Sequence, residues 1–247
     1  MTKKVTAPEG SLRAPQASRK KTPAMERRTT IVEAMAARGH AYSNLWLAQS
    51  VRANRDWILP SDPEFVHFLC LEFDPEVRTL DLAPPEVVVR VGHDDRKTRF
   101  DAIVEFVDGR RECREVKFTE SVDPADVRSA LQHEAQLRAC ERFNGTYVRV
   151  YGDVLAKQRY RWLNSARMLR CIHASEGYAT QRHRSDCGTR LIHSPNGVRL
   201  QELVTLFPPD ESALVMAAVF RLLSERLLSI DIDTEWVTLA SLVRLRT

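Results

Sequence analysis

The sequence predicts a mixed α/β (α+β) protein whose main domain is built around one β-hairpin. Residues 98–117 form two runs of alternating side chains that flank a polar turn, Asp108-Gly109-Arg110. An Asp-Gly pair between alternating runs is a strong hairpin signal, because glycine accepts the positive φ that a tight turn requires. Helical patterns precede and follow the hairpin, and a short strand pattern comes next at 146–151. This order predicts an α+β core rather than a helix bundle or a β-sandwich.

The helix before the hairpin is predicted over 63–73. Ser61 supplies a capping side chain, Pro63 stands near the first helical position, and Glu64 places an acid in the first turn. Four aromatic or aliphatic residues recur at near-helical spacing: Phe65, Phe68, Leu69 and Phe73. Asp74-Pro75 is expected to end the helix.

The other elements of this domain are predicted from the spacing of apolar side chains and from the residues that form turns. Strands are predicted at 76–82 and 86–91, with a polar loop at 93–97. A helix is predicted over 124–143 and ends at Asn144-Gly145. Nearer the N-terminus a short helix is predicted at 29–38, and 41–57 has no clear assignment.

The last fifty residues indicate a second, smaller domain. Two helices are predicted at 198–207 and 210–228, separated by Pro208-Pro209, and two strand-like pieces follow at 230–232 and 235–245. Two helices and two strands in so short a segment predict a winged-helix-like unit. The preceding segment is rich in Arg, His and Gly without a sustained period. The predicted organisation is therefore a basic disordered tail at 1–28, a main domain at 29–175, a linker at 176–195 and a winged-helix-like domain at 196–247.

Charge and composition indicate an ordinary globular chain with one unusual end. The 247 residues are 43% hydrophobic and carry a net charge of +4, which permits a sizeable core. Residues 1–28 hold eight Lys or Arg against two acids, a composition that builds no core. The tail is expected to be either a solubilising extension or a basic arm that contacts nucleic-acid phosphates.

Cysteine usage and hydropathy predict a cytoplasmic protein without a membrane span. The five cysteines are odd in number and form no paired framework. No apolar run approaches the ~18 residues of a membrane helix, and the basic N-terminus lacks the apolar segment of a secretion signal. A zinc site can be imagined from one set of residues, although their spacing matches no compact zinc motif: Cys171, His173, His183, Cys187 and His193.

The hairpin also carries the candidate chemistry. In a strand, alternate side chains share a face, so Glu115 and Lys117 lie together, while Asp101 begins the partner strand. Carboxylate oxygens are the ligands that Mg²⁺ prefers, and a lysine beside the metal can stabilise charge on a phosphodiester. Glu64, on the preceding helix, is a candidate third acid. The alternative is that Asp101 is merely a strand-start acid and that Glu115 and Lys117 form a surface pair.

These residues resemble a known group of enzymes. Glu64, then Asp101 in FDAIVEF, then Glu115-Val116-Lys117 resemble the PD-(D/E)XK nuclease superfamily with its restriction-endonuclease-like core. The finer pattern SDPEFVHFLCLEFDPEVRTLDL, the two strands after it and Asn164 in RWLNSARML resemble the TnsA-type endonuclease subunit of heteromeric transposases. The chain departs from that family at Phe100, where proline is frequent, and at 83–85, where Ala-Pro-Pro replaces Gln-Pro.

The resemblance implies a function for the chain. It implies that Glu64, Asp101 and Glu115 bind Mg²⁺, with Mn²⁺ as a substitute, and that Lys117 assists hydrolysis. The enzyme would nick the 5′ transposon ends in double-stranded DNA while a DDE transposase subunit acts on the 3′ ends. An AAA+ regulator would contact the C-terminal domain. The alternatives are a non-catalytic DNA-binding or adaptor protein with a degenerate nuclease core, and a repair or restriction nuclease.

Overall fold

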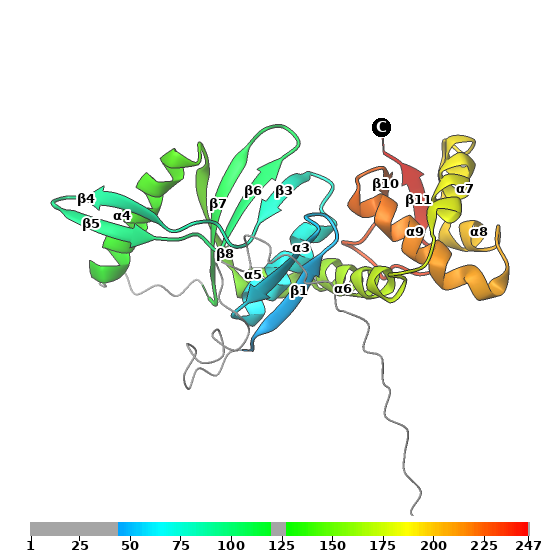
Figure 1. Cartoon of the computed structure of the whole chain (residues 1–247), viewed down its shortest axis with the longest axis horizontal. Coiled ribbons are helices and arrows are strands. Elements are labelled where there is room, and N and C mark those ends of the chain that lie inside the picture. The colour runs from blue at the N-terminus through cyan, green and yellow to red at the C-terminus, as the bar shows by residue number, and fades with distance from the viewer. Residues whose placement is uncertain (1–43, 120–126, 247) are drawn as a thin grey trace, which may run out of the picture.

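The computed structural model describes residues 44–119 and 127–246. The chain is a mixed α/β protein in which helices accompany several small sheets (Figure 1). The predicted tail at 1–28 and the predicted helix at 29–38 lie outside the described residues. Among the described residues, no helix has the length and apolar character needed to cross a membrane.

The central sheet has four strands in the order β3-β6-β7-β8. They are β3 (Val77–Asp81), β6 (Ala102–Phe106), β7 (Arg111–Lys117) and β8 (Thr146–Tyr151). The predicted hairpin is confirmed, since β6 and β7 pair antiparallel and Gly109 in the turn has φ +86°. Strand β3 lies antiparallel to β6, whereas β8 lies parallel to β7.

Two helices cover opposite faces of this sheet. The predicted helix at 63–73 is α3 (Asp62–Glu72), and its His67 contacts Arg114 of β7. Helix α4 (Val127–Arg142) packs on the other face, where its Gln136 lies against Tyr147 of β8. The sheet therefore lies between two helices (Figure 1).

Residues 41–57 have no clear assignment from the sequence, and the structure places a hairpin that covers α3 at 46–59. It consists of β1 (Trp46–Ser50) and β2 (Arg55–Leu59). The Trp46 ring stacks on Phe65 with centroids 4.1 Å apart. The buried Glu72 at the end of α3 accepts hydrogen bonds from the backbone N–H groups of Val51 and Arg52 at 2.7 and 2.9 Å, which fixes the turn of this hairpin.

The predicted polar loop at 93–97 is wrong except for His93 in the turn, because residues 94–97 belong to a strand. Strand β4 (Val87–Val91) pairs antiparallel with β5 (Asp94–Thr98), and the pair projects at one end of the molecule (Figure 1). The side chains of β5 are mostly polar, yet pairing with β4 satisfies its backbone. Helix α4 packs against this hairpin and buries Val89 and Val91.

The C-terminal part is joined to the sheet by two consecutive helices, α5 (Gly152–Lys157) and α6 (Arg159–Ala174). Its three short strands form a sheet in the order β10-β11-β9. Its elements in chain order are α7 (Gln181–Ile192), β9 (Val198–Arg199), α8 (Leu200–Val204), the 3₁₀ turn η1 (Pro209–Glu211), α9 (Ser212–Ser224), β10 (Leu228–Ser229) and β11 (Leu242–Leu245).

The prediction of a linker at 176–195 is wrong over most of its length. Helix α7 occupies 181–192 and buries His183, Cys187 and Leu191 against the rest of the C-terminal part. The two helices predicted at 198–207 and 210–228 are also shorter than expected, because β9 and η1 take their first residues.

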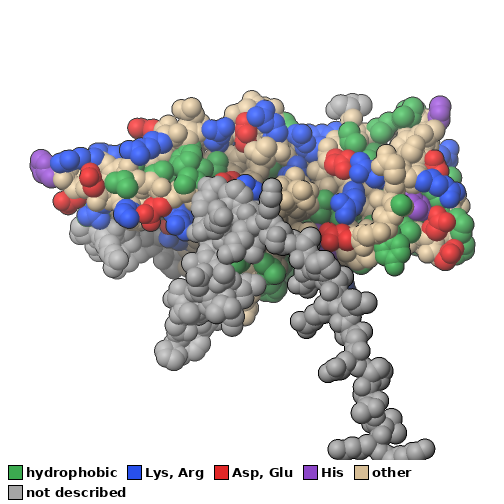
Figure 2. Space-filling model, viewed as in Figure 1, with side chains coloured by type: hydrophobic (Ala, Val, Ile, Leu, Met, Phe, Trp, Pro, Cys, Tyr) green, Lys and Arg blue, Asp and Glu red, His purple; other side chains and the backbone are tan. Residues whose placement is uncertain are grey.

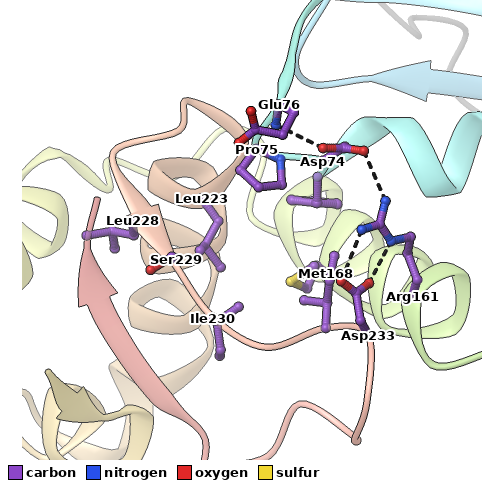
Figure 3. A pocket seen from close by; sticks show the side chains of 12 residues that line it. Asp74, Pro75, Glu76, Arg161, Met168, Leu223, Leu228, Ser229, Ile230 and Asp233 are labelled. Carbon is purple, nitrogen blue, oxygen red and sulfur yellow. Dashed lines mark hydrogen bonds and ion pairs between the residues drawn. The ribbon is translucent and has the colours of Figure 1, made fainter. Parts of the chain in front are cut away.

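Ion pairs tie the two parts together across α6. Arg161 lies between Asp74, at the end of α3, and Asp233, with distances of 3.0 Å from Nη1 to Asp74 Oδ2 and 2.6 Å from Nε to Asp233 Oδ1 (Figure 3). Beside them is a cavity of about 250 Å³ whose apolar wall includes Met168 and Leu223. A continuous hydrophobic core runs from α3 through α6 to α9.

Candidate active site

The open end of the β6–β7 hairpin brings Asp101 and Glu115 to the same place. Ala102 pairs with Arg114, so Asp101 stands one residue before this pair and Glu115 one residue after it. The Asp101 N–H donates to the Arg114 carbonyl at 3.0 Å. The Asp101 carboxylate turns toward β7, where its Oδ2 accepts the Val116 N–H at 2.8 Å. One carboxylate therefore comes from each strand of the hairpin.

Glu115 and Lys117 share one face of β7, as the alternation predicts. The Lys117 ammonium lies 2.5 Å from Glu115 Oε1, and the Lys117 side chain is 44% exposed against 11% for Glu115. Burial of the carboxyl acts to raise the pKa of Glu115, but the hydrogen bonds from Lys117 and Tyr147 outweigh burial and lower it. Glu115 is therefore a carboxylate near neutral pH, with Lys117 on its exposed side.

Three polar residues that the sequence did not single out surround Glu115. The Tyr147 hydroxyl donates to Glu115 Oε2 at 2.5 Å, and Arg149 Nε donates to the same hydroxyl at 3.0 Å. The buried Gln136 places its Oε1 3.0 Å from that hydroxyl. Alternation in β8 puts Tyr147 and Arg149 on one face, but only the parallel pairing of β8 with β7 turns that face to Glu115.

Glu64 lies in the first turn of α3, whose start lies close to the end of β7. Ser61 caps the helix, because its Oγ accepts the Glu64 N–H at 3.3 Å, and the Ser61 hydroxyl donates to Glu64 Oε1 at 3.0 Å. A Cβ on Gly152 would lie 3.0 Å from the Phe118 carbonyl oxygen and 3.0 Å from Pro63 Cγ. The start of α3, the residue after Lys117 and the start of α5 therefore meet at one point.

Of the three predicted acids, only two are placed so that they could bind a hard cation such as Mg²⁺ together. Within residues 44–119 and 127–246, no group of three or more His, Cys, Asp or Glu has the arrangement of a metal cluster. The three acids Glu64, Asp101 and Glu115 are therefore not gathered into such a cluster there. Mg²⁺ is commonly held by only one or two carboxylates, with water and phosphate completing its shell. Asp101 and Glu115 fit that smaller requirement.

Several arginines of α6 and α7 are engaged in ion pairs. Arg161 pairs with Asp74 and Asp233, and three arginines of α7 pair with acids of their surroundings: Arg182 with Asp186, Arg184 with Glu225 and Arg190 with Glu202. Figure 2 shows Lys and Arg side chains interspersed with Asp and Glu over this face. Positive charge on this face is thus spread rather than gathered over α7.

Comparison with known proteins adds no assignment. No protein-family model and no curated protein matches the chain.

Proposed function

We propose that the chain is a metal-dependent DNA endonuclease. The observation that carries this proposal is the hairpin end, where Lys117 lies 2.5 Å from Glu115 and the Asp101 carboxylate hydrogen-bonds the peptide between them. Two carboxylates and a lysine converge on one edge of a sheet, which is the combination needed to hold a divalent cation beside a phosphodiester.

The order of the elements supports a restriction-endonuclease-like core of the PD-(D/E)XK type. Helix α3 is followed by β3, by the separate hairpin β4–β5, and by β6 and β7; α4 then leads to β8, which pairs parallel to the Glu-x-Lys strand. This is the continuation that the resemblance implies. In the C-terminal part, α7, α8 and α9 with a three-stranded sheet are consistent with a winged-helix-like domain.

The residues have distinct roles in this proposal. Asp101 and Glu115 would hold Mg²⁺, while Glu64, on α3, is the third acid that the resemblance implies. When bound, the cation lowers the pKa of a water ligand and neutralises charge on the phosphate. Lys117 places its ammonium at the exposed side of Glu115, where it can stabilise the charge that develops on the phosphate oxygens.

We further propose that the enzyme acts in transposition, in the cytoplasm, and nicks 5′ transposon ends beside a DDE transposase. Its AAA+ regulator would dock on the C-terminal part. This step rests on the resemblance of the 61–82 segment and of Asn164 to TnsA-type subunits. The arginine ion pairs of α7 are compatible with a protein-docking role for this part, because these side chains already have acidic partners.

A nicking assay tests the proposal. Supercoiled plasmid carrying candidate transposon ends would be incubated with the full chain, the partner transposase and Mg²⁺ or Mn²⁺. Glu115→Gln, Asp101→Asn and Lys117→Met are each expected to lower the nicking rate by about 10²- to 10³-fold, the usual loss when one electrostatic group of an active site is removed.

Glu112→Gln is the matched control, because Glu112 lies on β7 but on the opposite face, where it pairs with Arg114. Nicking at the wild-type rate by all three site variants would show that this hairpin is not catalytic. Metal-independent nicking by the wild-type chain would also contradict the proposal.

A further inference from the structure

The Glu115 carboxylate is held on its two oxygens by different elements. Lys117, on the same strand, lies 2.5 Å from Oε1, while Tyr147, on the parallel neighbour β8, donates to Oε2 at 2.5 Å. The two contacts fix the plane of the carboxylate. They also make its oxygens unequal, since Lys117 lies on the exposed side and Tyr147 on the side of α4.

Tyr147 is itself held so that its hydrogen points to Glu115. A phenol has a single hydrogen to donate, and the ionised carboxylate is a stronger acceptor than the neighbouring amide oxygen of Gln136. Arg149 Nε donates to the Tyr147 oxygen at 3.0 Å and so occupies an acceptor site of the hydroxyl.

We propose that Tyr147 is a positioning residue that fixes Glu115 Oε2 and presents Oε1 to a divalent cation. This inference rests on the proposed function. Because Lys117 contacts the same Oε1, a cation that approaches this oxygen competes with the ammonium group. Tyr147 and Lys117 therefore act on cation binding with opposite signs: the hydroxyl favours it, and the ammonium opposes it.

This opposition separates positioning from a merely structural role. A tyrosine that only fills space would affect folding when changed, and its removal would leave the cation affinity of the folded protein unaltered. Loss of a group that orients a metal ligand typically weakens metal affinity by about 10- to 100-fold. Removal of a like charge beside the ligand should instead strengthen binding.

The experiment is a titration of the full chain with Mn²⁺ alone, without DNA, followed by the electron paramagnetic resonance signal of free Mn²⁺. Tyr147→Phe is expected to weaken Mn²⁺ binding by about 10- to 100-fold. Lys117→Met is expected to tighten it by roughly tenfold. Tyr178→Phe is the matched control, because Tyr178 is 65% exposed and lies beyond α6; its affinity should equal that of the wild type.

Glu115→Gln separates failure of the inference from failure of the proposed function. If Glu115→Gln binds Mn²⁺ as the wild type does, Glu115 is not a ligand, and both are overturned. If Glu115→Gln loses binding while Tyr147→Phe matches Tyr178→Phe, only the positioning role is overturned. Circular dichroism checks folding. Should Tyr147→Phe not fold, Arg149→Lys takes its place, because it keeps the positive charge near Glu115 but loses the Nε–H group that donates to the Tyr147 hydroxyl; an unchanged affinity in that variant would overturn the inference.

Discussion

Asn164 and Val237 lie 73 residues apart in the sequence, yet the Asn164 side chain accepts the Val237 N–H at 3.0 Å. Its amide group also donates to the carbonyl oxygens of Ile232 and Glu235, at 3.1 and 2.8 Å. Asn164 is fully buried in α6. One side chain thus satisfies three backbone groups of the segment between β10 and β11 and fixes that segment on α6.

Asn164→Ala is expected to lower the free energy of unfolding by about 2 to 4 kcal/mol. The substitution leaves three backbone groups without their side-chain partner, and each unsatisfied buried group costs about 1 to 3 kcal/mol before relaxation and water entry recover a part. Urea denaturation followed by circular dichroism measures the change. Asn196→Ala, at an exposed position before β9, should stay within about 0.5 kcal/mol of the wild type. Equal stability of the two variants would contradict the role of Asn164.

His67 gives the protein a predictable dependence on pH. It is buried in α3, and its Nε2 accepts a hydrogen bond from Arg114 Nη1 at 3.1 Å. Burial, followed by the charge of Arg114, lowers the pKa of His67 from 6.5 to about 3. The unfolded chain therefore binds a proton below about pH 6.5 that the folded chain does not bind, so this residue makes folding less favourable as the pH falls.

Between pH 7.5 and 5.5 the loss attributable to His67 should be about 1.4 kcal/mol, since protonation of His67 in the unfolded chain becomes about tenfold more favourable over this interval while the folded chain stays neutral. Urea denaturation at both pH values measures it. His67→Gln should lose about that much less stability over this interval than the wild type does. His93→Gln, at an exposed position, should keep the wild-type dependence. If His67→Gln also keeps the wild-type dependence of stability on pH, His67 is not held neutral in the folded protein.

Local signals predicted the elements that build the site. The Asp108-Gly109 turn and the alternation around it predicted β6 and β7, and the Ser61 cap with Pro63 predicted α3, because turns and caps depend on residues close together in sequence. The placement of Glu115 and Lys117 on one face followed from the strand period alone.

Other features depend on partners that a local pattern does not contain. Helix α7 buries every fourth residue, but two of these residues, His183 and Cys187, are not ordinary apolar residues. The apolar periodicity of this segment is therefore weak in the sequence. Strand β5 is polar and is held by pairing with β4. Tyr147 becomes a neighbour of Glu115 only through the parallel pairing of β7 and β8, which the sequence does not specify.

Gly152→Ala is expected to disturb the candidate site more than the fold. An added Cβ would lie 3.0 Å from both the Phe118 carbonyl oxygen and Pro63 Cγ, so the residue after β7 or the start of α3 must give by a few tenths of an ångström. Such overpacking costs about 1 to 3 kcal/mol, and it shifts Lys117 relative to Glu64. We expect metal-dependent nicking to fall at a temperature where the variant is still folded.

Gly188→Ala is the matched control: nothing lies within 4 Å of its Cβ position in α7, and alanine favours the helix. It should leave nicking unchanged and raise stability by up to about 1 kcal/mol. Equal nicking by the two variants would show that the meeting of α3 and β7 is unimportant for the reaction.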